Sequence, residues 1–369
     1  MRRVKKIMLV FIAVVVTILI ASLIFILFWP SFGKRPSSEM AKTFSEKTDL
    51  YFNNKFNNAE DFKLIVDVKD KLKKEETEEI NKRPNKTIKV NKLTELEDAD
   101  ISDMKITWFG HSTSLIQIHG MNILIDPILS EYASPVGFAG PKRFSEVPMK
   151  AEDLPEIDLV LISHDHYDHM DYNTIKEIDS KVKAYCVPLG VDSHLDRWGI
   201  EESKINTLSW WEDVNINGLM ISLTPGQHFS GRLPWNMNST LWGGYVLKDE
   251  YNSLYYTGDT GYGEFFKEVY NRYGEFDVVL IEAGQYDDKW PYSHMNPKNT
   301  LKAAEDLSAK WVIPIHWGAF VLANHSWDDS VNKLTSSAED SFVNVATPRI
   351  GETVDIKEID NYQEKWWLE

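Results

Sequence analysis

Ser163-His164-Asp165-His166-Tyr167-Asp168-His169 is the stretch that decides the fold class, because three imidazoles and two carboxylates directly follow an apolar run at residues 158–162. The run predicts a buried strand. Alternate residues of an extended chain point the same way, so the first two histidines can face one metal ion, and the turning chain can present Asp168 and His169 to a second. Without a cation, so many buried polar groups would stay unpaired at a cost in free energy. The stretch therefore predicts a metal site at a strand end.

Three further candidate ligands, His228, Asp259 and His316, each follow another predicted strand. Loops after strands are common places for functional sites. Each residue alone is typical of a loop or turn, but their joint occurrence after separate strands favours metal ligation. We expect one ion on His164, His166 and His228, a second on Asp168, His169 and His316, and Asp259 as the bridge between the two ions.

Nitrogen and oxygen donors without a thiolate suit zinc, with Mn²⁺ or Fe²⁺ as alternatives. The single cysteine, Cys186, excludes an internal disulfide and a cysteine-based zinc site. Two bridged cations lower the pKa of bound water and clamp the reacting oxygens, so the chemistry indicated is hydrolysis. The sequence therefore predicts a hydrolase with two Zn²⁺ ions, in which Asp168 and Asp259 take part in catalysis.

Short apolar runs between turns predict strands at 106–109, 115–118, 123–125, 159–162, 184–187, 220–223, 245–247, 254–256, 278–281 and 311–315. Apolar residues at every third or fourth position predict helices at 172–178, 264–273 and 299–307. Alternating strands and helices indicate a layered α/β protein. The formal net charge of −16 argues against nucleic acid as a partner, because phosphate backbones bind basic surfaces.

The N-terminus carries an uncharged apolar stretch at residues 7–29, and about 20 such residues can cross a bilayer. A cleaved signal peptide is the alternative, but its apolar region would be shorter and would end in small residues rather than Phe28-Trp29-Pro30. We favour an uncleaved single-pass anchor in the cell membrane. More basic residues precede the stretch than follow it, which predicts a cytoplasmic N-terminus and an extracytoplasmic catalytic domain.

The chain is expected to have three parts: a membrane anchor at 1–30, a charged connector at 31–100 and a hydrolase domain at 101–369. Lysine and glutamate alternate at helical spacing in 69–86, so we expect the connector to be partly helical. Its aromatic residues suggest that part of it packs on the domain. Nothing in the sequence indicates an oligomeric state.

The histidine motif has the His-x-His-x-Asp-His spacing of the metallo-β-lactamase fold, and the likeness extends beyond the ligands. Matching segments are Phe109-Gly110-His111-Ser112, Asp126-Pro127, Gly140-Pro141-Lys142-Arg143-Phe144, Gln227-His228, Leu241-Trp242-Gly243-Gly244, Gly258-Asp259-Thr260-Gly261-Tyr262 and Ile315-His316-Trp317-Gly318. In these segments the chain resembles the N-acyl-phosphatidylethanolamine-hydrolysing phospholipases D.

The resemblance implies a four-layer αβ/βα sandwich and the seven ligands named above. It also implies cleavage of a phospholipid phosphodiester on the head-group side, releasing phosphatidic acid, with a phospholipid substrate and the membrane as partners. His294 also resembles the family and is expected to polarise a phosphoryl oxygen or to protonate the leaving group. The segment 284–290 departs from the family pattern, so the substrate stays open. An alternative is a same-fold hydrolase of a small soluble phosphoester or lactone, similar to L-ascorbate-6-phosphate lactonase.

Several residues outside the ligand set are assigned supporting roles. His111, Asp126 and Asp165 are expected to orient ligands from behind, because a metal-bound imidazole usually donates its second N–H to a carboxylate or carbonyl. Candidate substrate-binding residues are Tyr286, Trp290 and Trp235, and His119, His194 and His325 are interpreted as surface or packing residues.

Overall fold

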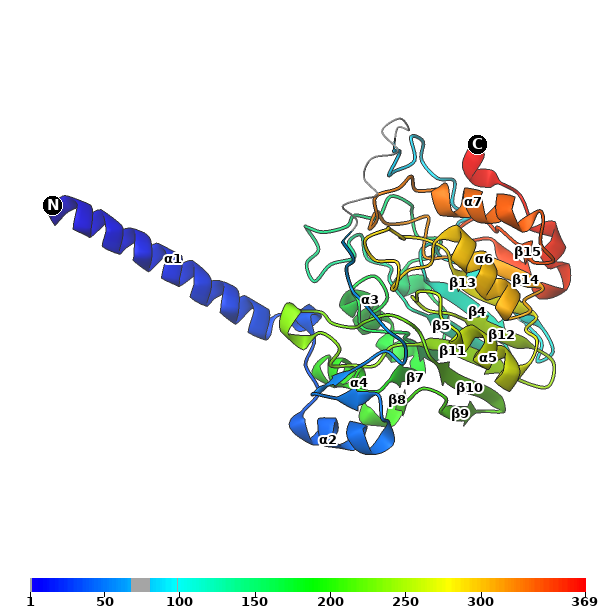
Figure 1. The fold of residues 1–369 in the computed structure, drawn as a ribbon, viewed down its shortest axis with the longest axis horizontal. Helices are drawn as coiled ribbons and strands as arrows, with labels where there is room; N and C mark the ends of the chain where they lie inside the picture. Colours follow the sequence, from blue (N-terminus) through cyan, green and yellow to red (C-terminus); the bar gives the residue numbers. More distant parts are fainter. Residues whose placement is uncertain (1, 68–79, 98) are drawn as a thin grey trace.

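The computed structural model describes residues 2–67, 80–97 and 99–369, and its body is built from two seven-stranded sheets (Figure 1). One sheet has the strand order β16-β3-β4-β5-β6-β7-β8 and the other β15-β14-β13-β12-β11-β10-β9. In each sheet the four strands on one side pair in parallel, β5 to β8 in the first and β12 to β15 in the second, and the other pairs are antiparallel. Both sheets contain parallel strand pairs whose C-terminal ends share an edge.

The first sheet consists of β3 (Met104–Trp108), β4 (Ser114–Ile118), β5 (Met121–Ile125), β6 (Ile157–Leu161), β7 (Val182–Pro188), β8 (Ile205–Leu208) and β16 (Thr353–Asp355). The second consists of β9 (Asp213–Ile216), β10 (Leu219–Thr224), β11 (Gly244–Lys248), β12 (Ser253–Tyr256), β13 (Val278–Glu282), β14 (Trp311–Ile315) and β15 (Asn344–Val345). The helices are α1 (Arg2–Phe28), α2 (Ser38–Lys47), α3 (Tyr172–Ile178), α4 (Asp192–Arg197), α5 (Phe265–Tyr273), α6 (Pro297–Asp306) and α7 (Asp329–Ala338). A short hairpin joins β1 (Tyr51–Phe52) to β2 (Lys55–Phe56).

Side-chain alternation along the strands divides the apolar residues between two faces. On β4, Ile116 and Ile118 join the core between the two sheets, whereas Leu115 joins the core beneath α3 and α4. On β13, Leu280 joins the core between the sheets and Ile281 joins the core beneath α5, α6 and α7. Both faces of each sheet are therefore covered, as parallel strands require.

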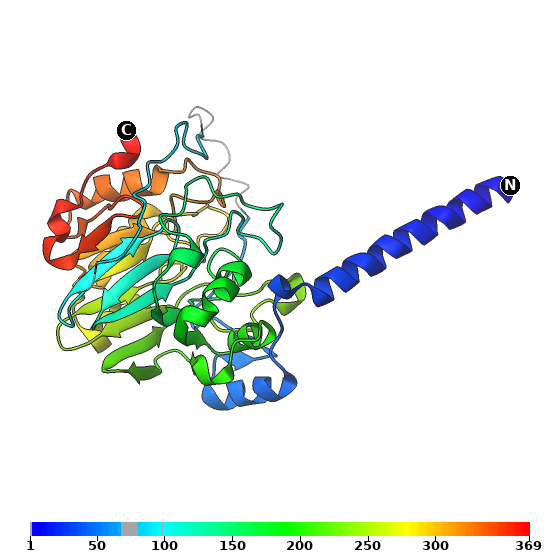
Figure 2. The same cartoon turned by 180° about the vertical axis from the view of Figure 1, so that it is seen from behind.

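Helices cover the outer faces of the sandwich. Figure 1 shows α5, α6 and α7 over one sheet, and Figure 2, seen from behind, shows α3 and α4 over the other. The predicted four-layer αβ/βα sandwich is confirmed. All ten predicted strands and the three predicted helices form, and no predicted end differs from the observed one by more than two residues.

The elements that the sequence did not predict are mostly edge strands and short helices. β9 reads Asp-Val-Asn-Ile and is half exposed, so it lacks the continuous apolar run of a central strand. α4 has only six residues, too few to establish a helical period.

α1 projects away from the domain and is exposed along its length (Figures 1 and 2). Its segment Arg3–Phe28 has a mean hydropathy of 3.2 over its most apolar window and is long enough to cross a membrane. Its length and composition agree with the predicted anchor.

The residues after α1 contact the sandwich extensively. Phe44 of α2, Phe56 of β2 and Ile88 belong to the core cluster between the sheets. In the block 69–86, residues 69–79 lie outside the described residues, and 80–86 form neither helix nor strand. The division into an anchor, a connector and a domain stays a proposal.

Candidate metal centre

The candidate ligands leave the C-terminal ends of five strands at one edge of the sandwich. They follow β3 (His111), β6 (His164, His166, Asp168, His169), β10 (His228), β12 (Asp259) and β14 (His316). Both sheets contribute, so the fold brings together residues that are up to about 200 positions apart in the chain. This edge is where ligands bind in most open α/β sheets.

Three residues at this edge have left-handed backbone angles, although none of them is glycine. φ is 55° at His111, 41° at Asp126 and 68° at His316. Such angles are uncommon outside glycine and cluster at functional sites. The tight turns bring His111 and His316 together, where the His111 and Trp317 main chains form an isolated β-bridge.

His164, His166 and His228 form the first group of candidate ligands. The His166 Nδ1 atom lies 2.9 Å from His164 Nε2 and 3.4 Å from His228 Nε2. Two facing imidazole nitrogens can share only one proton, whereas three lone pairs that converge in this way can bind one cation. The group matches the predicted first ligand set.

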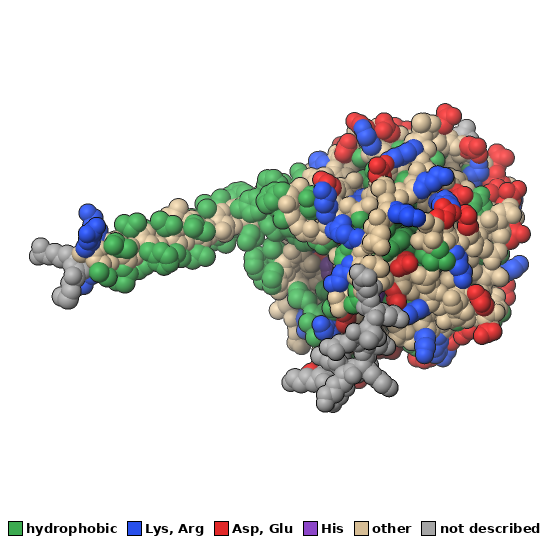
Figure 3. All heavy atoms as spheres, turned by 90° about the horizontal axis from the view of Figure 1, so that it is seen from above, with side chains coloured by type: hydrophobic (Ala, Val, Ile, Leu, Met, Phe, Trp, Pro, Cys, Tyr) green, Lys and Arg blue, Asp and Glu red, His purple; other side chains and the backbone are tan. Residues whose placement is uncertain are grey.

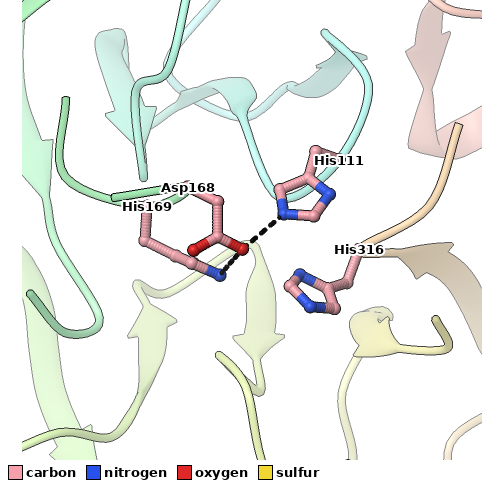
Figure 4. Close-up of side chains that lie close together, drawn as sticks. All are labelled: His111, Asp168, His169 and His316. Carbon is pink, nitrogen blue, oxygen red and sulfur yellow. Dashed lines mark hydrogen bonds and ion pairs between the residues drawn. The ribbon is translucent and has the colours of Figure 1, made fainter. Parts of the chain in front are cut away.

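His111, Asp168, His169 and His316 form the second group (Figure 4). Asp168 Oδ2 lies 2.8 Å from His111 Nε2 and 3.4 Å from His169 Nε2. The His111 and His316 rings are 4.2 Å apart between centroids. His111 therefore lies directly against the predicted ligands of the second ion.

Asp259 lies between the two groups. Its carboxylate oxygens are 3.1 Å from His169 Nε2 and 3.1 Å from His316 Nδ1 in the second group, and 4.0 Å from His228 Nε2 in the first. A carboxylate in this position can bind one cation with each oxygen. The placement agrees with the predicted bridging role.

Asp126 orients the second group from behind. Its carboxylate accepts hydrogen bonds from His169 Nδ1 at 2.6 Å and from the Ser163 main-chain N–H at 2.7 Å, and the Tyr256 hydroxyl also donates to it. The bond to Nδ1 leaves Nε2 of His169 free to face the centre. His228 is oriented in the same way, because its Nδ1 donates to the Ser293 carbonyl at 3.0 Å.

Burial keeps the imidazoles of the first group uncharged, as metal ligation requires. It lowers the pKa of His166 to about 4 and lowers the pKa of His164 and His228 well below the usual value. In the second group, burial likewise lowers the pKa of His316 well below the usual value. These four side chains can offer lone pairs at neutral pH.

His169 differs because carboxylates surround it. Burial lowers its pKa, but the charges of Asp259, Asp168 and Asp126 outweigh burial and raise the pKa well above its ordinary value. Burial raises the pKa of Asp259 to about 6, against the opposing charge of His169. Three carboxylates, Asp126, Asp168 and Asp259, thus lie against one imidazole, and a bound cation would offset their charge.

Four buried polar atoms at this centre make no well-aligned hydrogen bond: His111 Nδ1, His169 Nε2, His316 Nε2 and Asp259 Oδ1, although His169 Nε2 and Asp259 Oδ1 each have an ion-pair partner at 3.1 Å. Buried polar atoms in folded proteins are almost always paired, so a set of orphans at one place needs an explanation. A pair of divalent cations would satisfy His169, His316 and Asp259 together. The described residues therefore fit the predicted two-metal site.

His294 stands beside both groups, with its ring centroid 5.2 Å from that of His228 and 5.3 Å from that of His316. Its Nδ1 lies 3.2 Å from Glu282 Oε1, and Glu282 Oε2 accepts the Met295 main-chain N–H at 2.9 Å. Burial raises the pKa of Glu282 well above its ordinary value. Glu282, which the sequence analysis did not single out, thus holds the His294 ring with Nε2 directed away from it.

The remaining predicted site residues use their polar atoms elsewhere. Asp165 accepts hydrogen bonds from His194 and Gly231 rather than from a ligand imidazole. The Tyr286 hydroxyl donates to Asp329, Trp290 Nε1 donates to the Gln285 carbonyl, and Trp235 is 61% exposed. Tyr286, Trp290 and Trp235 stay predictions as substrate-binding residues.

Two supporting residues carried no recognisable sequence signal. Asn58 bonds the main chain of His228 twice, donating to its carbonyl at 2.8 Å and accepting from its N–H at 3.0 Å. Gln285 Oε1 accepts the main-chain N–H groups of Leu322 and Ala323 and so braces the loop after His316. Asparagine and glutamine are common in loops, so only the contacts of Asn58 and Gln285 reveal that they support the centre.

Comparisons with known proteins agree with this geometry. A family described as the beta-lactamase superfamily domain matches residues 121–317. An uncharacterized protein of Mycobacterium tuberculosis is 38% identical over 260 residues, covering 69% of this chain and 70% of the relative. The N-acyl-phosphatidylethanolamine-hydrolyzing phospholipase D 1 of Caenorhabditis elegans is 33% identical over 290 residues, covering 73% and 81%.

Among solved structures, Igni18, a novel metallo hydrolase from Ignicoccus hospitalis, superimposes with a TM-score of 0.53 at 22% identity. The superposition covers 69% of this chain and 98% of the Igni18 chain. The superposition supports the fold, and the sequence relatives support the family. The chain therefore belongs to the beta-lactamase superfamily and is a metal-dependent hydrolase with the metallo-β-lactamase fold.

Proposed function

We propose that this protein is a membrane-anchored, zinc-dependent phosphodiesterase of the phospholipase D type. Its substrate is N-acyl-phosphatidylethanolamine or a related phospholipid, and it releases phosphatidic acid. The observation that carries the proposal is the pair of adjacent ligand groups that Asp259 joins, in a chain similar to an enzyme named for this reaction. Nitrogen and oxygen donors without sulfur favour zinc.

Zinc ions bound by these residues would supply Lewis acidity, stabilising negative charge on phosphoryl oxygens and making water nucleophilic at neutral pH. The protein's own groups set the geometry. Asp168 is oriented by His111, and Asp259 joins the two groups. His294, oriented by Glu282, can present Nε2 to a phosphoryl oxygen or to the leaving alkoxide. The oxygen of water bonds to phosphorus and the P–O bond to the head group breaks. The head-group alcohol leaves with one proton from water.

The anchor and several exposed aromatic side chains support a lipid substrate. Phe138 is 79% exposed and Trp235 61% exposed, although both are large apolar residues. Their loops touch the end of α1: Trp29 Nε1 donates to the Pro135 carbonyl at 2.7 Å, and Arg232 Nε donates to the Ser31 carbonyl at 2.8 Å. Tryptophan favours the membrane interface, where its apolar ring and its N–H both find partners.

The surface at this junction suits a substrate that enters from the bilayer. Figure 3 shows hydrophobic atoms that continue from α1 onto the adjoining part of the domain, with a histidine visible in the hollow beside them and basic side chains nearby. Basic groups attract anionic lipid head groups. In the proposed topology the N-terminus is cytoplasmic and the domain lies outside the cytoplasm.

The test is hydrolysis of N-acyl-phosphatidylethanolamine in mixed micelles by the full-length, zinc-loaded protein, with phosphatidic acid measured by mass spectrometry. Hydrolysis in H₂¹⁸O should place the label on phosphorus. His166→Ala is the blank. His119→Ala is the matched control, because His119 also bonds an aspartate, Asp249, but contributes to neither ligand group.

Zinc-dependent, ¹⁸O-labelled phosphatidic acid from the wild type and His119→Ala, but not from His166→Ala, would support the proposal. Turnover of a soluble phosphoester or lactone without any phospholipid cleavage would overturn the lipid substrate and favour the small-molecule alternative.

A further inference from the structure

We propose that residues 29–34, which we call the juxtamembrane segment, position the first ligand group. In this role the segment is a structural part of the metal centre rather than a spacer. It acts through two buried positioning residues, His194 and Arg232, which contact both the segment and the ligand loop 164–170. The inference concerns metal binding and does not depend on which substrate is cleaved.

His194 connects the segment to the loop by two hydrogen bonds. The Lys34 main-chain N–H donates to His194 Nδ1 at 2.9 Å, and His194 Nε2 lies 3.1 Å from Asp165 Oδ2. Because Nδ1 accepts a hydrogen bond from the Lys34 main-chain N–H, the proton of the neutral ring must reside on Nε2, which donates a hydrogen bond to Asp165. The segment therefore sets the tautomer that makes the second bond possible. His194 is fully buried and is not merely a packing residue.

Asp165 lies between two candidate ligands in the chain, His164 and His166. Its second oxygen accepts the Gly231 main-chain N–H at 2.6 Å. The carboxylate is thus held from both sides, and any displacement of it would turn the imidazoles on either side of it in the chain. Partners behind a metal site orient the ligands in this way.

Arg232 provides the second connection and is 4% exposed. Its Nε donates to the Ser31 carbonyl at 2.8 Å, and its Nη1 donates to the carbonyls of Asp165 at 2.7 Å and Met170 at 2.9 Å. The two loop carbonyls flank three candidate ligands of the loop, His166, Asp168 and His169. Its guanidinium also lies 4.1 Å from the Tyr167 ring centroid. A rigid fork of donors suits this bridging role better than a flexible lysine would.

The segment itself is held in one conformation. Trp198 Nε1 donates to the Pro30 carbonyl at 2.8 Å, and Ser193 Oγ donates to the Lys34 carbonyl at 2.7 Å. Gly33 has φ +71°, and a Cβ atom there would lie 2.1 Å from His194 Nδ1. The close approach of the segment to His194 therefore requires glycine at this position.

Gly33→Ala tests the inference without altering either positioning residue. Gly120→Ala is the matched control, because Gly120 has a similar φ of +67° but nothing within 4 Å of an added Cβ. Both substitutions place a Cβ on a residue with positive φ, and only Gly33→Ala displaces the segment from His194. Zn²⁺ affinity would be measured on the full-length protein in detergent by chelator competition, together with the visible absorption of bound Co²⁺.

We expect Gly33→Ala to weaken binding at one of two metal positions by about 10- to 100-fold, and to alter the Co²⁺ spectrum. Gly120→Ala should retain the wild-type affinity and spectrum. Thermal unfolding of the metal-free proteins should show a larger loss for Gly33→Ala, because only its Cβ meets His194, and Zn²⁺ affinities are therefore compared at a temperature at which both variants are folded. Equal Zn²⁺ affinities and identical Co²⁺ spectra in the two variants would overturn the inference.

Substitution of His194 provides a second test, which remains available if Gly33→Ala does not fold. His194→Ala should weaken Zn²⁺ binding, whereas His119→Ala should not, although each removes a histidine that is bonded to an aspartate and near a main-chain group. In His194→Gln the side-chain amide offers an acceptor oxygen and a donor NH₂ group, so this variant should recover part of the affinity. Full Zn²⁺ affinity in His194→Ala would overturn the inference. Because no substrate is used, these outcomes are separate from those that test the proposed function.

Discussion

The two ligand groups have different supports. The first group depends on parts of the chain that precede the domain: Asn58 bonds the main chain of His228, and the juxtamembrane segment reaches the His164–His166 loop through His194 and Arg232. The second group depends on the domain, because Asp126 bonds His169, and Ser112 Oγ lies 2.9 Å from His316 Nδ1.

The comparison shows that a two-metal centre can have two separate sources of order. A change in the juxtamembrane segment should affect the first group more than the second, whereas a change at Asp126, after β5, should do the opposite. Asp259 contacts both groups and should couple them.

The largest effect on zinc content and on hydrolysis is expected at Asp259, where the two groups meet. Asp259→Asn removes the charge that joins them, so we expect zinc content to fall from two ions toward one or none. Hydrolysis should fall by about 10³-fold, since a metal clamp supplies several kcal/mol of transition-state stabilisation. Elemental analysis and a phosphodiesterase assay would measure this. Asp249→Asn is the control, and full activity with two zinc ions in Asp259→Asn would refute the bridging role.

Asp126→Asn should weaken the second group most, because Asp126 bonds His169 directly and reaches His164 of the first group only through Ser163 Oγ. The amide keeps the size of the carboxylate but loses the charge that orients His169, so we expect about 10- to 100-fold weaker binding of one ion. Paired with Gly33→Ala, it should give a double variant whose losses nearly add, because each change acts mainly on a different group. Strong non-additivity in the zinc titration would show that the two groups are not independent.

Asn58→Ala should have a smaller effect, confined to the first group. It removes two hydrogen bonds to the His228 main chain, worth roughly 2 kcal/mol of unfolding free energy in total. Zinc affinity should fall by less than about tenfold. Urea unfolding with and without zinc would measure both quantities. Asn57→Ala is the control, since Asn57 bonds only carbonyls of the β1–β2 hairpin and its flank; an equal loss of zinc affinity in both variants would contradict the assignment.

The smallest effect of the Gly33→Ala substitution is expected in the core between the two sheets, which contains Cys186. Burial raises the pKa of the Cys186 thiol on β7 to about 12, so the reactive thiolate is essentially absent from the folded protein at pH 8. A thiol reagent should label the native wild type and Gly33→Ala equally slowly, and the urea-unfolded chain at once. Fast labelling of native Gly33→Ala alone would mean that displacement of the juxtamembrane segment opens the sheet as well as the ligand loop.

Much of the candidate centre could be predicted because its ligand residues can be recognised from the sequence. Histidines and aspartates that directly follow apolar runs combine a chemical signal with a structural one, and the structure brings all seven predicted ligands together. Glu282 was missed although it ends β13, because a single glutamate after an apolar run resembles an ordinary strand end.

The support around the centre could not be predicted. His194 lies on the six-residue helix α4, Arg232 in a loop and Asn58 in the segment before the domain, and each is far in sequence from the ligand that it holds. Hydrogen-bond donors of this kind occur throughout the chain, so the residue type alone does not indicate a role.

The sequence by itself determined the layered α/β fold and the ligand loop after β6, because strand alternation and the His-x-His-x-Asp-His spacing are local properties of the chain. Only the tertiary structure decided that the residues leaving α1 turn back onto that loop. Main-chain carbonyls and N–H groups make these contacts, as at Ser31 and Lys34, and every residue type except proline offers both groups. Which main-chain groups pair depends on where the folded chain places them, and no sequence pattern predicts this pairing.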